Sequence, residues 1–231
     1  MKDKFVKLGF NPSNILVAPD GVDLEKFNIK ESSVECRNKL NLPRDKKIIG
    51  YVGQLRTMGM DKGIVDLVEA YKILKNEFPD LIAVSVGGSQ KDIDFYENIL
   101  KEKGIQGNGF IFRGQRPYHE IPFYLKAFDV LVMPFPYNEH YAFYMSPLKL
   151  FEYMASGKPI VATDLPSLKG ILDKDNSILV KPDNYRELAD GVKFFLKNPD
   201  EAQKFAERAF EGVKNYTWQK RAGTILKFIN E

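Results

Sequence analysis

The sequence is poor in the residues that bind metals and form disulfides. It contains one cysteine, Cys36, and two histidines, His119 and His140. A single cysteine excludes an internal disulfide, a paired-thiol redox motif and a cysteine-rich zinc cluster. Neither histidine stands at metal-ligand spacing from a second histidine or a cysteine, so a zinc site is excluded as well. We therefore expect no metal and no cofactor.

Long apolar runs and clusters of like charge are also missing. No run approaches the roughly 20 residues of a membrane-spanning helix. The charged N-terminus (MKDKFVKLGF) lacks the apolar core of a signal peptide, so a cytoplasmic protein is expected. The net charge is +3, and basic residues are interspersed with acidic ones. A nucleic-acid partner is not expected, whereas the weak positive charge is compatible with peripheral membrane association.

What the chain does have is the pattern of a globular α/β protein. Of its 231 residues, 44% are hydrophobic and 28% charged, and a chain of this length buries roughly 70% of its unfolded surface. From residue 47 onward, β-rich runs without polar alternation alternate with amphipathic helical stretches. This order predicts a Rossmann-like, doubly wound parallel sheet with helices on both faces. The expected strands are Ile48–Leu55, Leu81–Gly87, Phe110–Gly114, Val130–Phe135, Ile160–Thr163 and Ser177–Val180.

Three regions follow from this pattern. Residues 1–46 are expected to be a lead-in that packs on the domain and carries one short strand, Ile15–Ala18. Residues 47–199 form the expected ligand-binding domain, with a short helix after Ile160–Thr163. Residues 200–231 are expected to be helical, with a break near Asn215. Because ligands of such sheets bind beyond the carboxyl ends of the strands, candidate sites are sought directly after each strand.

The strongest local signal is the pair Ser146–Pro147. Serine is a favoured N-cap residue and proline is favoured at the first helical position, so a helix is expected to begin here and to end near Gly157. The free N–H groups and positive dipole end of a helix form an anion site. Lys149 lies in the first turn, where a lysine costs roughly a few tenths of a kcal/mol unless an anion is present. A phosphate site would produce this conflict.

Helical spacing places Lys149, Glu152 and Ser156 on one face of this helix. At ~1.5 Å per residue, Glu152 lies roughly 9 Å along the helix from its cap. A carboxylate there can accept hydrogen bonds from both hydroxyls of a ribose whose phosphates cap the helix. The alternative is a solvated Lys149–Glu152 pair that contributes about 0.3 kcal/mol. Spacing alone does not separate the two interpretations.

The loop after the first strand carries two cations. Gly53 permits a ligand to approach the backbone, and Arg56 and Lys62 bracket a mobile loop that opens a helix. Two cations at the carboxyl end of a strand can neutralise a diphosphate leaving group. The order of Lys62 and Gly63 excludes a P-loop. A surface loop with solvated charges is the alternative interpretation.

Weaker candidates occupy three further loops. They are Gly87 and Gly88 after the second strand, Arg113 and Gly114 after the third, and Glu139 and His140 in the loop before Ser146. Near the third strand, backbone groups could bind a nucleotide base and Tyr118 could stack on it. Plain strand-to-helix turns are the alternative interpretation of the second and third strand ends.

Taken in order, these segments resemble the C-terminal, donor-binding domain of the family-four (group 1) retaining glycosyltransferases of GT-B fold. The stretches that carry the resemblance are ILVAPDGVDLEKF (15–27), YVGQLRTMGMDKG (51–63), residues 110–134, SPLKLFEYMASGKPIVAT (146–163) and SILVKPDNYRELADGV (177–192). They extend over nearly the whole chain. The resemblance implies one half of a GT-B architecture, a nucleoside-diphosphate sugar as substrate, and transfer of a hexosyl group with retention and without a metal.

The resemblance also implies roles for individual residues. Arg56 and Lys62 match the basic residues that stabilise the departing diphosphate, and Glu152 matches the second glutamate of a pair separated by seven residues, which binds ribose. The first glutamate falls at Tyr144, so the contact to the sugar departs from the family pattern. The implied catalytic residues are Arg56 and Lys62. The implied donor-binding residues are Gly53, Gly87, Gly88, Arg113, Gly114, Glu139, His140, Tyr144, Ser146, Pro147, Leu148, Lys149 and Glu152.

Members of that family also carry an N-terminal acceptor-binding domain, and this chain begins at the linker that follows it. The resemblance therefore implies a missing acceptor domain, toward which residues 200–231 would return. Two alternatives stay open. One is a non-catalytic nucleotide-sugar-binding or interaction module, which Tyr144 favours. The other is a sugar-nucleotide epimerase of related fold, whose carboxylate and histidine would come from the Glu139–His140 loop.

Overall fold

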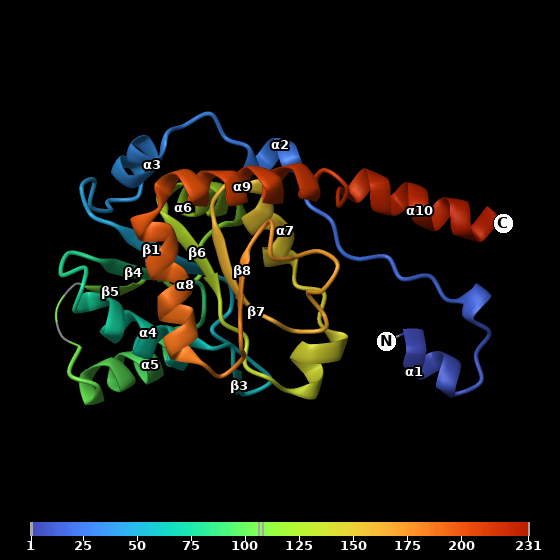
Figure 1. The fold of residues 1–231 in the computed structure, drawn as a ribbon, viewed down its shortest axis with the longest axis horizontal. Helices are drawn as coiled ribbons and strands as arrows, with labels where there is room; N and C mark the ends of the chain where they lie inside the picture. Colours follow the sequence, from blue (N-terminus) through green and yellow to red (C-terminus); the bar gives the residue numbers. More distant parts are fainter. Residues whose placement is uncertain (1, 106, 108, 231) are drawn as a thin grey trace.

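A parallel sheet forms the centre of the protein (Figure 1). The structure is a computed structural model that describes residues 2–105, 107 and 109–230. Within these residues the sheet has six strands in the order β5-β4-β1-β6-β7-β8, and each adjacent pair is parallel. The strands are β1 (Ile48–Val52), β4 (Ile82–Val86), β5 (Phe110–Phe112), β6 (Val130–Met133), β7 (Ile160–Thr163) and β8 (Ile178–Val180).

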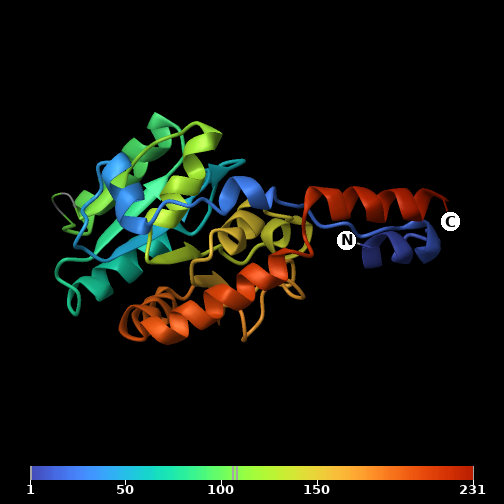
Figure 2. The same cartoon turned by 90° about the horizontal axis from the view of Figure 1, so that it is seen from above.

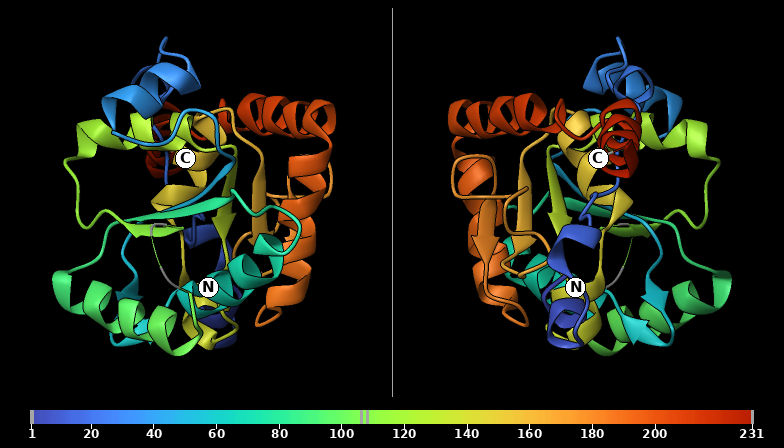
Figure 3. Two further views of the ribbon diagram at one scale, coloured as in Figure 1. Left: turned by 90° about the vertical axis from the view of Figure 1, so that its left-hand side faces the viewer. Right: turned by 90° about the vertical axis from the view of Figure 1, so that its right-hand side faces the viewer.

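Helices cover both faces of the sheet, which the end-on views show (Figure 3). One face packs against α4 (Ile64–Lys75), α5 (Gln90–Glu102) and α8 (Tyr185–Lys197). The other packs against α3 (Ser33–Lys39), α6 (Ile121–Ala127), α7 (Leu148–Ala155) and α9 (Pro199–Val213). Each face has its own apolar core cluster. The predicted doubly wound sheet with helices on both faces is confirmed.

Strand β1 shows why these hydrophobic runs lack polar alternation. All five of its residues are buried. Because side chains alternate along a strand, Ile48 and Val52 enter one core cluster while Ile49 and Tyr51 enter the other. Between them, Gly50 leaves room for the ring of Phe128, since a Cβ at Gly50 would lie 1.8 Å from a ring carbon.

The lead-in and the last helix extend from the same end of the domain (Figure 2). Helices α1 (Lys2–Lys7) and α10 (Trp218–Asn230) bury no residue, whereas α2 (Leu24–Phe27) contributes Phe27 to the core and α3 contributes Cys36. A backbone bridge joins Val22 to Thr217. In the described part of the chain, no helix is long and apolar enough to cross a membrane.

Two local predictions about secondary structure were wrong, and one is confirmed. Residues 15–18 form no strand, because they run outside the sheet without a partner strand in the described chain. Residues 165–172 form turns rather than a short helix, closed by hydrogen bonds such as that from the N–H of Leu168 to the carbonyl of Leu165. The break near Asn215 is present, since α9 ends at Val213 and α10 begins at Trp218.

A buried arginine ties the lead-in to the sheet. Arg37 is 6% exposed, and its guanidinium donates hydrogen bonds to the carbonyls of Ala127 (2.8 Å), Arg44 (3.0 Å) and Lys46 (3.1 Å). It also pairs with the carboxylate of Asp129 at 2.8 Å. One side chain thus joins α3, the segment before β1 and the end of α6.

Replacing Arg37 with methionine keeps an apolar stem but leaves Asp129 without its cation. We expect Arg37→Met to lower the free energy of unfolding by about 3 kcal/mol, the usual cost of breaking a buried ion pair. Urea denaturation of this variant beside Arg44→Met, whose side chain is exposed, measures the effect. Equal midpoints for the two variants would contradict the structural role of Arg37.

Candidate functional site

A cavity of about 1000 Å³ opens beyond the carboxyl ends of β1, β4 and β6. Strand order reverses here, because β1 pairs with β4 on one side and β6 on the other, and ligands of open α/β sheets bind at such a point. The cavity lies among the loops after these three strands, the loop after β5 and the start of α7. Its volume is that of a small-molecule site.

The helix start that the sequence indicated lies one step later than predicted. Helix α7 begins at Leu148, and Pro147 is its N-cap with extended backbone. The predicted N-cap, Ser146, uses its hydroxyl to accept a hydrogen bond from the N–H of Asp20 at 3.2 Å. Ser146 is therefore part of the cavity wall and of the lead-in contact. The N–H groups of Leu148 and Lys149 have no acceptor inside the helix and remain available to an anion.

Lys149 has the most unusual environment of the site. It is 9% exposed, and its Nζ finds no hydrogen-bond partner among the described residues. The ammonium lies 3.8 Å from the centroid of the Tyr51 ring and 5.3 Å from that of Phe135. Burial lowers the pKa of Lys149 well below its usual range, Lys62 lowers it further, and Glu152 raises it. The interpretation of Lys149 and Glu152 as a solvated surface pair is therefore wrong.

Glu152 lies one turn further along α7, on the same cavity wall. Tyr118, from the short helix η2 (Tyr118–Glu120), lies near its carboxylate and favours the charged form. Burial raises the pKa of Glu152, while Tyr118 and Lys149 lower it. Tyr118 itself is 56% exposed and contacts the ring of Phe27 edge-on. The carboxylate of Glu152 thus has a polar neighbour from the protein itself.

The loop after β1 folds into a hairpin, whereas the sequence predicted no regular structure in it. Its strands β2 (Arg56–Thr57) and β3 (Met60–Asp61) pair antiparallel. Arg56 donates to the carbonyl of Gly59 at 2.7 Å and lies over the ring of Phe95. Lys62 is half-buried, and burial lowers its pKa. Both cations line the cavity.

Asp61, which was not among the predicted site residues, holds this hairpin in place. Its carboxylate accepts hydrogen bonds from the N–H groups of Gly63 (2.6 Å) and Ile64 (3.2 Å) and from the hydroxyl of Tyr96. It thereby joins β3 to the start of α4 and to α5. Asp61 stands three residues before the first helical residue, Ile64. An aspartate whose carboxylate accepts from the N–H two residues later forms an Asx turn, and an aspartate shortly before a glycine was the available signal.

Two glycine-bearing strand ends meet below Lys149. A Cβ at Gly53 would lie 2.5 Å from the Lys149 Nζ, and a Cβ at Gly87 would lie 2.2 Å from the carbonyl oxygen of Gly53. Gly53 and Gly87 also have positive φ angles, 138° and 116°. Gly88 lines the cavity beside them. Larger residues would fill the space where a ligand can approach the backbone.

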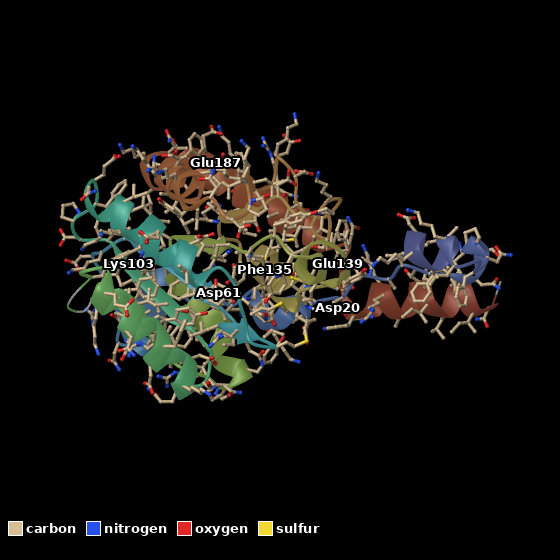
Figure 4. The ribbon with its side chains drawn as sticks, turned by 90° about the horizontal axis from the view of Figure 1, so that it is seen from below. Asp20, Asp61, Lys103, Phe135, Glu139 and Glu187 are labelled. Atoms are coloured by element: carbon tan, nitrogen blue, oxygen red, sulfur yellow. The ribbon has the colours of Figure 1, made fainter. Side chains whose placement is uncertain are left out.

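Three of the predicted site residues do not reach the cavity. The guanidinium of Arg113 donates a hydrogen bond to the carbonyl of Asn41 at 3.1 Å. The carbonyl of Gly114 accepts a hydrogen bond from the N–H of Gly87 at 2.7 Å. Glu139 is exposed and pairs with Lys4 at 2.7 Å, and in Figure 4 it lies toward the projecting end of the molecule. The predicted residues that do line the cavity are Gly53, Arg56, Lys62, Gly87, Gly88, His140, Tyr144, Ser146, Pro147, Leu148, Lys149 and Glu152.

Cavity residues that the sequence did not single out come from the same loops. They are chiefly Asp20, Gln54, Asp92, Gln115, Arg116 and Phe135. Among the described residues, no three His, Cys, Asp or Glu side chains come together as a metal site would require.

The fold and the cavity at its switch point define a Rossmann-like ligand-binding domain. Residues 33–212 match the sequence family described as "Glycosyl transferases group 1". The chain therefore belongs to the group 1 glycosyltransferases, which confirms the predicted family.

Relatives and solved structures agree with this assignment. The chain is 28% identical to the D-inositol 3-phosphate glycosyltransferase of Corynebacterium urealyticum, over 93% of this chain and 50% of that protein. It is 30% identical to the 2-deoxystreptamine glucosyltransferase of Streptomyces kanamyceticus, over 84% of this chain and 48% of that protein. The structure of Anabaena HepE in complex with UDP-glucose superposes on this chain with a TM-score of 0.82 at 20% sequence identity. The superposition covers 99% of this chain and 61% of the HepE chain. The chain spans about half the length of the curated relatives it matches.

The proximity of Tyr118 to Glu152 makes a testable prediction. In Tyr118→Phe the carboxylate loses the hydroxyl that favours its charged form, so we expect the pKa of Glu152 to rise further above its ordinary value. A ¹³C NMR titration of the glutamate carboxyl groups measures this shift. Tyr137→Phe, an exposed tyrosine outside the cavity, is the matched control. An unchanged Glu152 titration in Tyr118→Phe would show that the hydroxyl does not stabilise the carboxylate.

Proposed function

We propose that this chain is the donor-binding part of a glycosyltransferase that transfers a hexosyl group from a nucleoside-diphosphate sugar to an acceptor with retention of configuration. The observation that carries the proposal is the buried Nζ of Lys149, which has no hydrogen-bond partner among the described residues and belongs to the same cavity lining as the cations Arg56 and Lys62. A multiply charged anion is the ligand that such a set of donors matches.

The diphosphate is proposed to bind between the hairpin and α7. Lys149 and the N–H groups of Leu148 and Lys149 meet it from one side, and Arg56 and Lys62 from the other. As the bond to the sugar breaks, negative charge accumulates on the diphosphate oxygen. Donors already fixed at that position stabilise it without reorganising, and removal of one such donor typically slows an enzyme about 10²- to 10³-fold. Metal-independent transfer is part of the proposal, because side-chain cations take the place of a metal.

The nucleoside is proposed to extend along α7 toward Glu152. Leu148 and Glu152 are four residues apart, or about 6 Å along the helix axis, which suits a ribose joined to the bound phosphate. Its two hydroxyls would replace the Tyr118 hydroxyl as donors to the Glu152 carboxylate. Tyr118, which is exposed and carried on η2, would then be released to cover the base.

The sugar is proposed to lie at the opposite end of the cavity, against His140 and Tyr144. Tyr144 takes the place of the glutamate expected from the resemblance, and its hydroxyl is held by Glu139 and Lys4, so the sugar would meet no carboxylate at this position. Binding of the acceptor is assigned to sequence that the longer relatives have in addition to the part matched here. The epimerase alternative is disfavoured, because Glu139 lies outside the cavity and is paired with Lys4.

Calorimetric titration with UDP, GDP and ADP tests the proposed ligand class. We expect at least one of them to bind with a dissociation constant below about 1 mM. Loss of a charge-assisted hydrogen bond removes roughly 1.5–3 kcal/mol, so Arg56→Ala and Lys62→Ala should each weaken binding about ten- to a hundredfold. Lys72→Ala, an exposed lysine on α4, should bind normally. A folded domain that binds none of the three nucleotides would overturn the proposed function.

A further inference from the structure

The protein encloses the amino group of Lys149 without supplying an anion for it, and a diphosphate would supply one. The side chain is enclosed by the Tyr51 and Phe135 rings and by the backbone of Gly53. An ammonium group carries three donors, and none of them has an acceptor in the described structure. Contact with aromatic faces stabilises a cation only in part. Removing an ammonium from water without an anionic partner costs more than this contact returns, so the enclosure disfavours the charged form.

On these grounds we propose that binding of a nucleoside diphosphate is coupled to uptake of one proton by Lys149. This inference rests on the proposed function and deepens it. In the empty site the side chain is the neutral amine. When the diphosphate arrives, the lone pair of Nζ forms a bond to a proton released by the buffer, and the resulting ammonium donates to phosphate oxygens. Departure of the nucleotide returns the proton to solvent.

The charged groups around Lys149 agree with this coupling. From the loop between β3 and α4, the cation Lys62 faces it and repels the ammonium. From α7 itself, Glu152 attracts it, but that carboxylate is shared with Tyr118 and its own pKa is raised by burial. The hydroxyl of Tyr51, on β1, donates to the carbonyl of Gln54 at 2.7 Å. The other titratable groups that line the cavity are Asp20, Arg56, Asp92, Arg116, His140 and Tyr144. Those that act on Tyr51 beneath Lys149 are Asp61, Tyr96, Tyr141 and Tyr153.

The aspartates that line or adjoin the cavity in the described structure have partners of their own. Asp61 is engaged by Gly63, Ile64 and Tyr96. Asp92 accepts hydrogen bonds from Ser89, and Asp20 pairs with Arg221. Burial and Lys62 together hold the pKa of Lys149 well below its usual range. Two phosphate groups in contact with Nζ oppose both effects and raise that pKa. A group whose pKa rises on binding takes up a proton. The affinity for the nucleotide therefore falls as the pH rises from the pKa of Lys149 in the free protein toward its pKa in the complex.

Calorimetry in two buffers of different ionisation enthalpy measures the coupling. The ligand is whichever of UDP, GDP and ADP binds best, at about pH 8, where the nucleotide phosphates are fully ionised because their second pKa is roughly 6. For the unaltered chain, the dependence of the binding enthalpy on the buffer should correspond to uptake approaching one proton. Affinity should also fall as pH is raised from about 7 to 9.

Three variants identify the group that takes up the proton. Lys149→Arg carries a permanent charge, so it should bind the nucleotide without proton uptake. Lys149→Met fits an apolar enclosure, and should bind about ten- to a hundredfold more weakly, also without uptake. Lys62→Arg is the matched control and should retain the uptake. Circular dichroism confirms folding of each variant.

The outcomes separate this inference from the proposed function. Failure of every nucleotide to bind the unaltered chain overturns the proposed function. Nucleotide binding with an enthalpy independent of the buffer overturns only the coupling. Uptake that persists in Lys149→Met, or that disappears in Lys62→Arg, assigns the proton to another group and contradicts the role of Lys149.

Discussion

The reversal of strand order at β1 is the constraint on which the site depends. Because β4 and β6 lie on opposite sides of β1, the chain leaves the sheet in diverging directions and a cavity opens between the loops. Strand ends at Gly53 and Gly87 are packed too closely to carry side chains there. The start of α7 then brings the side chain of Lys149 against Gly53. The order of the strands thus places a basic side chain beside the exposed backbone at the ends of β1 and β4.

Much of this arrangement follows from local sequence. The uninterrupted apolar runs predicted strands buried on both faces, and β1 divides its side chains between two cores as expected. Helical spacing also placed Lys149 and Glu152 on one face of α7, where the structure puts both at the cavity. These features depend on contacts between residues close in sequence or on the regular spacing of side chains along a strand or helix. Both can be recognised in the sequence itself.

Features that depend on distant partners were not predictable. Ser146 is an excellent N-cap residue by type, but its hydroxyl is engaged by Asp20, 126 residues earlier. Arg113 and Glu139 have the chemistry of ligand-binding residues, and the carbonyl of Asn41 and the ammonium of Lys4 turn them away from the cavity. The burial of Lys149 could not be predicted from the sequence either, because it results from the rings of Tyr51, on β1, and Phe135, after β6.

A crystal structure of this chain with a bound nucleoside diphosphate is the most direct measurement. The proposed site predicts a phosphate oxygen within about 2.7–3.2 Å of the Lys149 Nζ, ribose hydroxyls on the Glu152 carboxylate, and the Tyr118 hydroxyl displaced from it. A nucleotide bound away from the α7 start, or a diphosphate out of reach of Lys149, would contradict the central claim that this buried lysine is the anchor of the donor site.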